Sequence, residues 1–480
     1  MSWQGPATAM CARERNPAVR YLLDLAYALL LLVLSPWLLY AILVRGRYRH
    51  GLSEKLLGRV PRRGGTGRCI WLHAVSVGEV NVLATLVAHL ERELPDVELV
   101  VSTTTPTGHE LARRRLPRQT VFFCPLDFSW ATRQALRRVR PDLVVLIELE
   151  LWPNLVLAAR EFGARVALVN GRLSDRSFRG YRRLRPFLAF LLRRLDLIAV
   201  QTEQYAARFR QLGAPPATVQ VTGSIKFDGA QGDRRNPVTA QLSRLAGIAP
   251  EDVVFLAGST QAPEEQLALA TFRELRRHFP QLRLILVPRH PERFTDVAAL
   301  LDQSGLIWQR RSELEQQPPR PGARVLLVDT IGELGAWWGT AQIAYVGGSL
   351  GRRGGQNMIE PAAYGAAVSF GPRTENFRDV VAALRAADAA VVVADGPALT
   401  GFVRWCLESP QAAVALGQRA RQLVAGHAGA AGHTAQQLTR LLAVSTDSPG
   451  RRTDGGHGAA AEPVRGRRAM GTAPPPPVPG

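Results

Sequence analysis

The stretch that decides the fold runs from Ile343 to Asp379 and reads IAYVGGSLGRRGGQNMIEPAAYGAAVSFGPRTENFRD. It opens with a short apolar run of the β type, 343–346, and continues later into an apolar helical segment, 357–364, which ends at Gly365 and is followed by a second short run, 366–370. Between the first run and the helix lie five glycines: Gly347, Gly348, Gly351, Gly354 and Gly355. This order of strand, glycine loop, helix and strand predicts one unit of a parallel α/β sheet.

The glycine loop and the helix start favour a bound nucleotide. Glycines let the backbone approach a ligand closely, and the first N–H groups of a helix attract an anion. Asn357 suits the helix cap. Glu360 could hold the hydroxyls of a ribose, or it could simply complement the helix dipole. The glycine spacing is not G-x-G-x-x-G, which argues against a hydride-transfer enzyme.

Length and charge set the broad class of protein. The chain has 480 residues, enough for two ordinary domains, and a formal net charge of +20. The basic residues are nearly all Arg, with Lys only at Lys55 and Lys226. The charge favours a phosphorylated lipid, an anionic membrane surface or a nucleic acid, but no nucleic-acid module is recognisable, so we expect no nucleic-acid partner. Cys11, Cys69, Cys124 and Cys406 lie far apart and fit neither a disulfide framework nor a zinc site, which favours a reducing compartment.

A membrane anchor is predicted near the N-terminus. After a polar segment, 1–20, the stretch 21–44 is apolar apart from Asp24, Ser35 and Pro36, and as a helix it would be about 36 Å long. Arginines are frequent directly after it and fewer before it, which places the body of the protein in the cytoplasm. Ser35-Pro36 leaves open whether the helix spans the membrane or dips into one leaflet.

Strand-like and helix-like segments alternate through the rest of the chain. They predict an α/β fold with two Rossmann-like domains, 50–228 and 248–430, that face each other across a cleft. The composition becomes polar between them, near Lys226. The end of the chain, 445–480, is rich in Gly, Ala, Arg and Pro and is predicted to be disordered.

Candidate residues of the first domain follow predicted strands. Glu79 begins a helix and could be a general base, or only a first-turn residue that matches the helix dipole. Glu148 and Glu150 follow a buried strand and are expected to alternate onto one face of it. Glu148 could orient a substrate or form a structural salt bridge. Thr105 and Gly108 lie in a hydroxyl-rich loop that could contact phosphate or sugar, although helix capping explains it almost as well.

Candidate residues of the second domain lie at comparable positions. Ser259 and Thr260 form a second hydroxyl-rich loop with the same two interpretations. Arg289 and His290 follow a strand; Arg289 would pair with a phosphate, whereas His290 is more often a structural hydrogen-bond donor. Lys226, at the domain junction, offers a compact ammonium in an Arg-rich chain.

Together these stretches resemble the 3-deoxy-D-manno-octulosonic acid (Kdo) transferase family over roughly residues 20–430. The matching strings are LHAVSVGEV, TTTPTG, ELELWPNL, NGRLSDRSFRGY, GSIKFD, LVPRHPERF and VGGSLGRRGGQNMIEPAAYG. The resemblance implies a two-domain GT-B glycosyltransferase that moves Kdo from CMP-Kdo to the lipid A precursor at the inner face of the cell inner membrane. One departure is Gln261, which stands where the family usually has His.

The resemblance also implies roles for individual residues. Glu79 matches the family's proton acceptor and Glu148 a carboxylate on the acceptor side. The residues expected to bind CMP are Arg289, His290, Gly347, Gly348, Gly354, Gly355, Asn357 and Glu360, and those expected near sugar or phosphate are Lys226, Ser259, Thr260, Thr105 and Gly108. Neither a metal nor another cofactor is expected, since CMP-Kdo is a substrate. The alternatives are a UDP-sugar transferase, a UDP-sugar epimerase and a non-catalytic basic membrane-binding protein.

Overall fold

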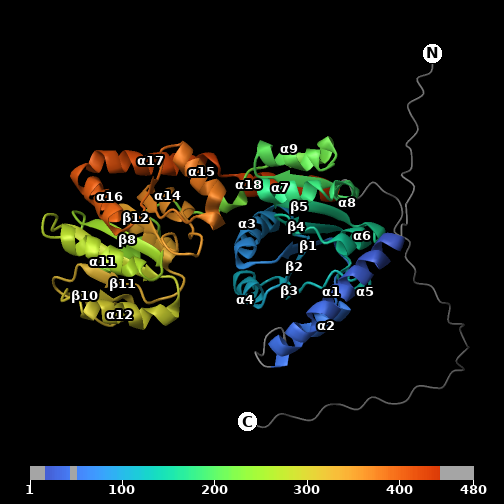
Figure 1. Cartoon of the computed structure of the whole chain (residues 1–480), viewed down its shortest axis with the longest axis horizontal. Helices are drawn as coiled ribbons and strands as arrows, with labels where there is room; N and C mark the ends of the chain where they lie inside the picture. The colour runs from blue at the N-terminus through green and yellow to red at the C-terminus, as the bar shows by residue number, and fades with distance from the viewer. Residues whose placement is uncertain (1–16, 44–50, 444–480) are drawn as a thin grey trace, which may run out of the picture.

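The computed structural model describes residues 17–43 and 51–443, with side chains from residue 19 to 36 and from 51 to 443. It shows two α/β lobes side by side (Figure 1), each built on a seven-stranded parallel sheet. The predicted two-domain α/β fold is therefore confirmed. The predicted tail, 445–480, and most of the polar N-terminus lie outside the described residues.

The first sheet has the strand order β3-β2-β1-β4-β5-β6-β7. Its strands are β1 (Cys69–Ala74), β2 (Glu98–Thr103), β3 (Thr120–Phe123), β4 (Leu143–Ile147), β5 (Arg165–Gly171), β6 (Leu197–Val200) and β7 (Val219–Val221). The accompanying helices are α2 (Leu52–Leu57), α3 (Val77–Glu93), α4 (Pro106–Arg115), α5 (Ser129–Val139), α6 (Pro153–Glu161), α7 (Asp175–Arg182), α8 (Arg185–Leu192) and α9 (Glu203–Gln211), with short 3-10 turns η1 (Pro216–Thr218) and η2 (Ile225–Phe227). β1 and β4 are buried along their whole length, as expected where helices cover both faces of a parallel sheet.

The second sheet has the order β10-β11-β9-β8-β12-β13-β14. Its strands are β8 (Val253–Thr260), β9 (Leu282–Pro288), β10 (Trp308–Arg310), β11 (Val325–Leu327), β12 (Ile343–Val346), β13 (Ala367–Phe370) and β14 (Val391–Val392). The helices are α10 (Pro237–Leu245), α11 (Glu264–Leu275), α12 (Phe294–Asp302), α13 (Leu334–Trp337), α14 (Ile359–Ala363), α15 (Arg378–Ala386), α16 (Gly396–Glu408) and α17 (Pro410–Gly426), with 3-10 turns η3 (Pro291–Arg293), η4 (Arg311–Glu313), η5 (Trp338–Thr340) and η6 (Glu375–Phe377). The stretch quoted at the outset supplies β12, which lies between β8 and β13 in the middle of this sheet.

The last described helix, α18 (Ala430–Ala443), returns to the first domain. Its residues Ala431, Ala435 and Leu438 belong to the same hydrophobic core as α3 and β1. The carboxylate of Asp228 accepts hydrogen bonds from the backbone N–H groups of Gly429 and Ala431 and so fixes the helix start. The chain therefore passes between the two domains twice, once after η2 and once between α17 and α18.

The N-terminal helix α1 (Pro17–Leu43) runs unbroken through Pro36. By length and composition alone, its window Val19–Pro36 could cross a membrane, and 11% of that window is buried inside the protein. The buried part lies where α1 contacts α5 and α6 at the edge of the first domain (Figure 1).

Candidate active site

Glu79 lies directly after β1, in the first turn of α3, and is 8% exposed. One carboxylate oxygen accepts the backbone N–H of Val75 at 2.8 Å and the other accepts the hydroxyl of Ser76 at 2.7 Å. The Ser76 hydroxyl, at the helix cap, in turn accepts the Glu79 N–H at 3.4 Å. Burial raises the pKa of Glu79 despite these hydrogen bonds, and the negative charge of Glu148 adds to the rise. The side chain therefore caps α3 and is also a stronger base than an ordinary glutamate.

Glu148 differs from its expected placement. β4 ends at Ile147, and Glu148 has a left-handed backbone with φ of 58°, so Glu148 and Glu150 lie in a turn rather than alternating along a strand. A non-glycine residue in this conformation is strained, and such strain is concentrated at functional sites. Its carboxylate forms an ion pair with Lys226 at 2.9 Å and lies 4.0 Å from Arg172. The side chain thus forms a salt bridge to the domain junction.

Glu150 was given no role in the site from the sequence, but the structure makes it a candidate. Burial raises its pKa to about 7, and the charges of Glu79 and Glu148 contribute further to the rise. Three carboxylates therefore lie close enough to influence one another, and among the described residues Lys226 and Arg172 are the cations paired with this group. Interacting carboxylates with separated pKa values are typical of catalytic sites. The pair of acids in ELEL was the available signal.

Thr105 and Gly108 have structural contacts. Thr105 caps α4 by accepting the Gly108 N–H at 3.1 Å, and it donates its hydroxyl to the Val75 carbonyl at 3.0 Å. A side chain at Gly108 would come within 2.8 Å of the Thr105 hydroxyl oxygen. The capping interpretation accounts for both residues, and their contacts hold the loop after β2 against the loop that carries Glu79.

In the second domain, a buried carboxylate occupies part of the glycine loop. Glu264, 1% exposed, accepts the backbone N–H groups of Gly348 at 2.7 Å and of Ser349 and Leu350 at 3.0 Å each, together with the Tyr345 hydroxyl at 2.8 Å. It also accepts the N–H of Gln261 at 2.9 Å. The backbone N–H groups of Gly348, Ser349 and Leu350 are therefore already hydrogen-bonded within the protein, so the role of Gly348 in CMP binding stays a prediction. In the sequence, the sign of this contact was Glu264 itself, an acidic residue shortly after the GST segment in GSTQAPEEQ.

The glycines of the loop are needed for backbone geometry. Gly348, Gly354 and Gly355 have φ of 66°, 81° and 79°, a region that other residues rarely adopt. At Gly347 a side chain would meet the carbonyl of Ser259 at 2.6 Å. The loop consequently packs directly against the end of β8.

Asn357 and Glu360 are paired, but in a shorter helix than expected. α14 begins at Ile359 with Met358 at its cap, so Asn357 is not the helix cap residue. Asn357 accepts the Ile359 N–H at 3.1 Å and donates to Glu360 at 3.0 Å. Burial raises the pKa of Glu360, whereas Asn357 and the charges of Arg115 and Arg289 oppose the rise.

The remaining candidates of the second domain lie at two neighbouring strand ends. Ser259 and Thr260 are the last residues of β8 rather than a loop beyond it, with φ of 53° at Ser259. Arg289 follows β9; its side chain is exposed and makes no ion pair with a described residue, and its backbone N–H donates to Thr260 at 3.0 Å. His290 lies 4.0 Å from Glu292 in the next turn.

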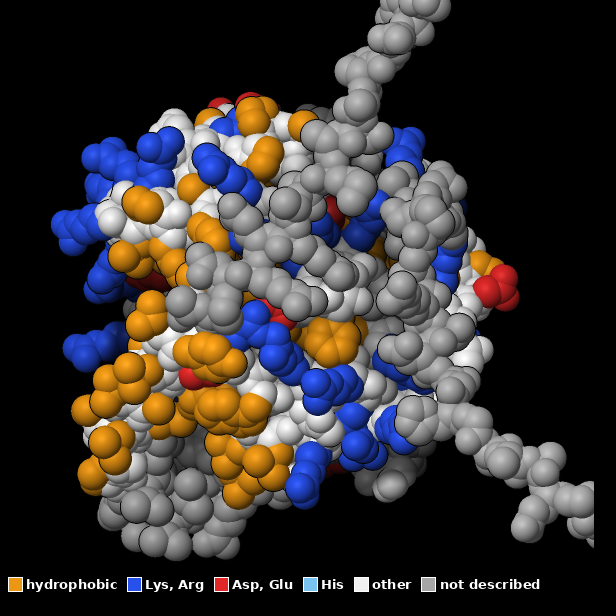
Figure 2. Space-filling model, turned by 90° about the vertical axis from the view of Figure 1, so that its right-hand side faces the viewer, with side chains coloured by type: hydrophobic (Ala, Val, Ile, Leu, Met, Phe, Trp, Pro, Cys, Tyr) orange, Lys and Arg blue, Asp and Glu red, His pale blue; other side chains and the backbone are white. Residues whose placement is uncertain are grey.

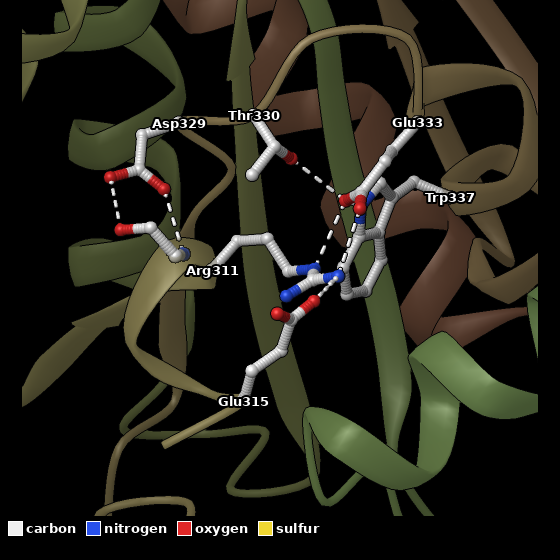
Figure 3. Close-up of polar contacts among 7 residues, drawn as sticks. Arg311, Glu315, Asp329, Thr330, Glu333 and Trp337 are labelled. Carbon is white, nitrogen blue, oxygen red and sulfur yellow. Dashed lines mark hydrogen bonds and ion pairs between the residues drawn. The ribbon is translucent and has the colours of Figure 1, made fainter. Parts of the chain in front are cut away.

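An ionic network around the buried Arg311 lies near the end of β11 (Figure 3). Arg311 donates to both oxygens of Glu333, at 3.0 and 2.8 Å, and to Glu315 at 3.1 Å. Thr330 and Trp337 donate to the same Glu333 carboxylate, at 2.7 and 3.2 Å. This network joins η4 to the start of α13 and is a structural element of the second domain.

Two pairs of residues from different domains interact electrostatically. Arg115, at the end of α4, lies close enough to Glu360 in α14 to oppose the rise of its pKa. Burial and the nearby Asp379 of α15 raise the pKa of Tyr205 in α9. The structure thus groups Glu79, Glu148, Glu150 and Lys226 on the first domain, and Arg289, Asn357 and Glu360 on the second. Within the described ranges, no group of three or more His, Cys, Asp and Glu side chains could hold a metal ion.

Two Rossmann-like domains, with a buried glutamate after the first strand and a glycine loop in the second domain, match the architecture of GT-B glycosyltransferases. A family model described as 3-Deoxy-D-manno-octulosonic-acid transferase (kdotransferase) matches residues 48–229. The 3-deoxy-D-manno-octulosonic acid transferase of Bordetella pertussis is 38% identical over 78% of this chain and 87% of its own length, and that of Haemophilus influenzae is 34% identical over 74% and 83%. The chain belongs to the 3-deoxy-D-manno-octulosonic acid transferase family, and it is an enzyme of the glycosyltransferase class.

The solved structures support the fold. UDP-GlcNAc 2-epimerase from Neisseria meningitidis, bound to UDP-GlcNAc, aligns with 78% of this chain and 100% of its own at a TM-score of 0.53 and 14% identity. At that identity the likeness concerns the two-domain architecture alone.

Proposed function

We propose that this enzyme transfers Kdo from CMP-Kdo to the lipid A precursor, lipid IVA, with inversion at the anomeric carbon. The observation that carries the proposal is Glu79, a buried carboxylate of raised pKa at the carboxyl end of β1, in a chain whose relatives are Kdo transferases. Open α/β sheets bind their ligands at that edge. The acceptor is expected at the first domain and the nucleotide at the second.

The acceptor hydroxyl must lose its proton as it attacks the anomeric carbon. Glu79 supplies the base, because its raised pKa increases its proton affinity while Val75 and Ser76 hold both its oxygens in place. Glu148 would then position the acceptor side of the site through its salt bridge to Lys226, since this pair connects the Glu79 region to the domain junction.

The departing CMP carries a phosphate anion that needs nearby positive charge. Arg289 is suited to this, because its exposed guanidinium makes no ion pair with a described residue. Glu360, oriented by Asn357, is proposed to bind the ribose hydroxyls. With these groups the transfer needs no metal, so activity should survive EDTA; loss of activity in EDTA, restored by a divalent cation, would refute this part.

The proposed location is the cytoplasmic face of the inner membrane. The net charge of +20 and the apolar α1 suit a bis-phosphorylated lipid acceptor in an anionic leaflet.

The deciding experiment is mass spectrometry of the lipid product formed by the full-length enzyme from CMP-Kdo and lipid IVA. We expect a mass increase of one or more Kdo residues with wild type and a strongly reduced yield with Glu79→Gln. Parallel reactions with UDP-sugars test the alternative donors. Transfer from a UDP-sugar but not from CMP-Kdo, or an epimerised free UDP-sugar, would overturn the proposal.

A further inference from the structure

One face of α1 is bound to the body of the protein by polar contacts. Arg20, Asp24 and Tyr27 are spaced four and three residues apart, so they lie on the same side of the helix. Asp24 accepts the backbone N–H of Ser129 at 2.8 Å, the Ser129 hydroxyl, and the side-chain amide of Asn154 at 3.1 Å. These three hydrogen bonds satisfy the partly buried Asp24 carboxylate, so Asp24 is a specific docking contact.

Two further contacts lie on either side of Asp24. The Arg20 guanidinium, on a residue 8% exposed, pairs with Glu161 at the end of α6. The Tyr27 hydroxyl donates to Asp127 at 3.1 Å, and Asp127 also accepts the backbone N–H groups of Asn154 at 2.9 Å and Leu155 at 2.8 Å. We call the helix residues Arg20, Asp24 and Tyr27 the docking face. The docking face extends about 10 Å along α1 and holds this part of the helix against the first domain.

The other sides of α1 are apolar and exposed. Leu22, Leu32 and Val33 are 65, 69 and 75% exposed, and Leu25, Leu29 and Leu30 are more than half exposed. Figure 2 shows a broad band of hydrophobic side chains on the face of the molecule that carries α1, bordered by Lys and Arg. Such a band beside basic side chains fits an anionic lipid leaflet.

The chain is bound to the same domain again just after α1. In α2, the Glu54 carboxylate accepts the Phe123 N–H at 2.6 Å, and the Leu56 carbonyl accepts the Trp130 indole N–H at 2.9 Å. From Leu43 to Gly51 the chain can reach at most about 28 Å. The hydrocarbon core is about 30 Å thick, and non-helical backbone does not cross it exposed to lipid.

A membrane-spanning α1 is therefore incompatible with these contacts. If the Arg20 end were on the far side of the membrane, it could not reach Glu161. If the Leu43 end were there, the chain would have to return across the hydrocarbon core before Gly51, and its full reach of about 28 Å is less than the thickness of that core, about 30 Å. We propose that α1 is an in-plane anchor: its docking face stays on the first domain, its apolar sides enter one leaflet, and both of its ends lie on the same side of the membrane as the body. This inference rests on the proposed membrane location and adds the geometry of attachment.

The test uses the full-length protein in bacterial cells and a membrane-impermeant maleimide. Cys11 precedes α1, and the three described cysteines, Cys69, Cys124 and Cys406, are buried. A Gln317→Cys variant provides an exposed thiol on the body. Labelling is compared in right-side-out spheroplasts and in inverted inner-membrane vesicles, with the labelled peptides identified by mass spectrometry and Cys11→Ser as the control.

We expect membrane-bound protein in which Cys11 and the thiol of the Gln317→Cys variant are labelled from the same side. Labelling of the two from opposite sides would overturn the in-plane anchor, as would recovery of the protein in the soluble fraction. If both are labelled from outside the cell, the in-plane anchor stands and the proposed cytoplasmic location fails. Kdo transfer in the same vesicles reports separately on the proposed reaction.

Two matched variants test the docking face. Asp24→Leu removes its central contact, whereas Ser35→Leu adds a comparable apolar side chain and leaves the docking face intact. We expect Asp24→Leu, but not Ser35→Leu, to make Cys11 accessible from the side opposite to the body in part of the molecules. Equal labelling of the two variants would overturn the role of the docking face.

Discussion

Glu79 has two roles: its hydrogen bonds stabilise the start of α3, and it is the proposed general base. A conservative substitution separates the two roles. In Glu79→Gln, the amide oxygen can still accept one of the two hydrogen bonds, and the Ser76 hydroxyl can accept from the amide N–H, so most of the cap remains. An amide cannot accept the proton of the acceptor. We expect turnover to fall by about a hundredfold to ten-thousandfold, with the melting temperature and CMP affinity nearly unchanged, as measured by transfer assay, thermal unfolding and calorimetry.

The opposite pattern would decide against the catalytic role. If turnover survives while the melting temperature drops, Glu79 is a capping residue only. Glu150, the other carboxylate of raised pKa in this group, would then be the next candidate base.

The pH dependence of the reaction reports on this carboxylate group. Like charges favour the neutral acid and so raise the pKa of a neighbouring carboxyl group. Burial and the charge of Glu148 raise the pKa of Glu79, the proposed base, so the acidic limb of kcat/KM should lie at a higher pH than an ordinary glutamate would give. The neighbouring Glu150, whose pKa is raised to about 7, interacts electrostatically with Glu79. In Glu150→Gln one negative charge is removed, the remaining carboxyl groups ionise more easily, and the acidic limb should move to lower pH. An unchanged limb, or one moved to higher pH, would show that Glu150 is not coupled to catalysis.

At the scale of single elements, the glycine loop depends on Glu264 in α11. The Glu264 carboxylate accepts hydrogen bonds from four backbone N–H groups and from the Tyr345 hydroxyl. In Glu264→Gln one of the two acceptor oxygens is replaced by an NH2 group, so some of these donors lose their acceptor. Leaving a buried donor unsatisfied costs about 1–3 kcal/mol, so we expect lower stability by chemical denaturation and weaker CMP binding by calorimetry. Glu274→Gln, on the exposed end of the same helix, is the control and should change neither. Normal CMP binding in Glu264→Gln would separate the loop from the nucleotide site.

The Arg311 network gives a prediction on stability alone. Arg311→Leu leaves the Glu333 carboxylate without its bidentate partner in a largely buried position. Breaking a fully buried pair from one side costs about 3–5 kcal/mol, and since the Glu333 side chain is 25% exposed we expect a smaller but clear loss of stability. The control is Arg310→Leu, because Arg310 is more exposed and its ion-pair distances are 3.9 and 3.6 Å. Equal unfolding free energies of the two variants would contradict a structural role for the network.

Elements with local signals were predictable from the sequence, whereas contacts between distant residues were not. The strand–loop–helix–strand order around Gly347 was predicted because apolar runs and glycines are local features. The occupation of the loop amides was missed because Glu264 lies 84 residues from Gly348. The expected alternation of Glu148 and Glu150 failed because a left-handed residue ends the strand, a conformation that glutamate does not signal. The short edge strands β3, β10 and β14 carry too few residues for a clear pattern.

At the scale of the whole molecule, the domains are joined by contacts that no single segment encodes. α18 completes the core of the first domain although it follows the second in sequence, and Asp228 holds its start from the domain junction. Arg115 of the first domain influences the pKa of Glu360 in the second, and Asp379 of the second domain influences the pKa of Tyr205 in the first. A change of domain orientation would therefore alter the electrostatic surroundings of Glu360.

Removal of residues 1–44 tests how far α1 serves attachment rather than chemistry. The deletion leaves Asp127, Glu161 and Asn154 without their α1 partners, so we expect a lower melting temperature. CMP affinity should remain, because the candidate nucleotide residues lie in the second domain. Transfer to lipid IVA in anionic vesicles should fall much more than transfer to lipid IVA in detergent micelles, because only the vesicle assay requires the protein to stay on a membrane surface. The measurement is the ratio of the two rates, with Leu22→Ala as a milder change that leaves the docking face intact. If the deletion lowers both rates equally while the protein remains folded, α1 acts on the catalytic site and not through membrane attachment.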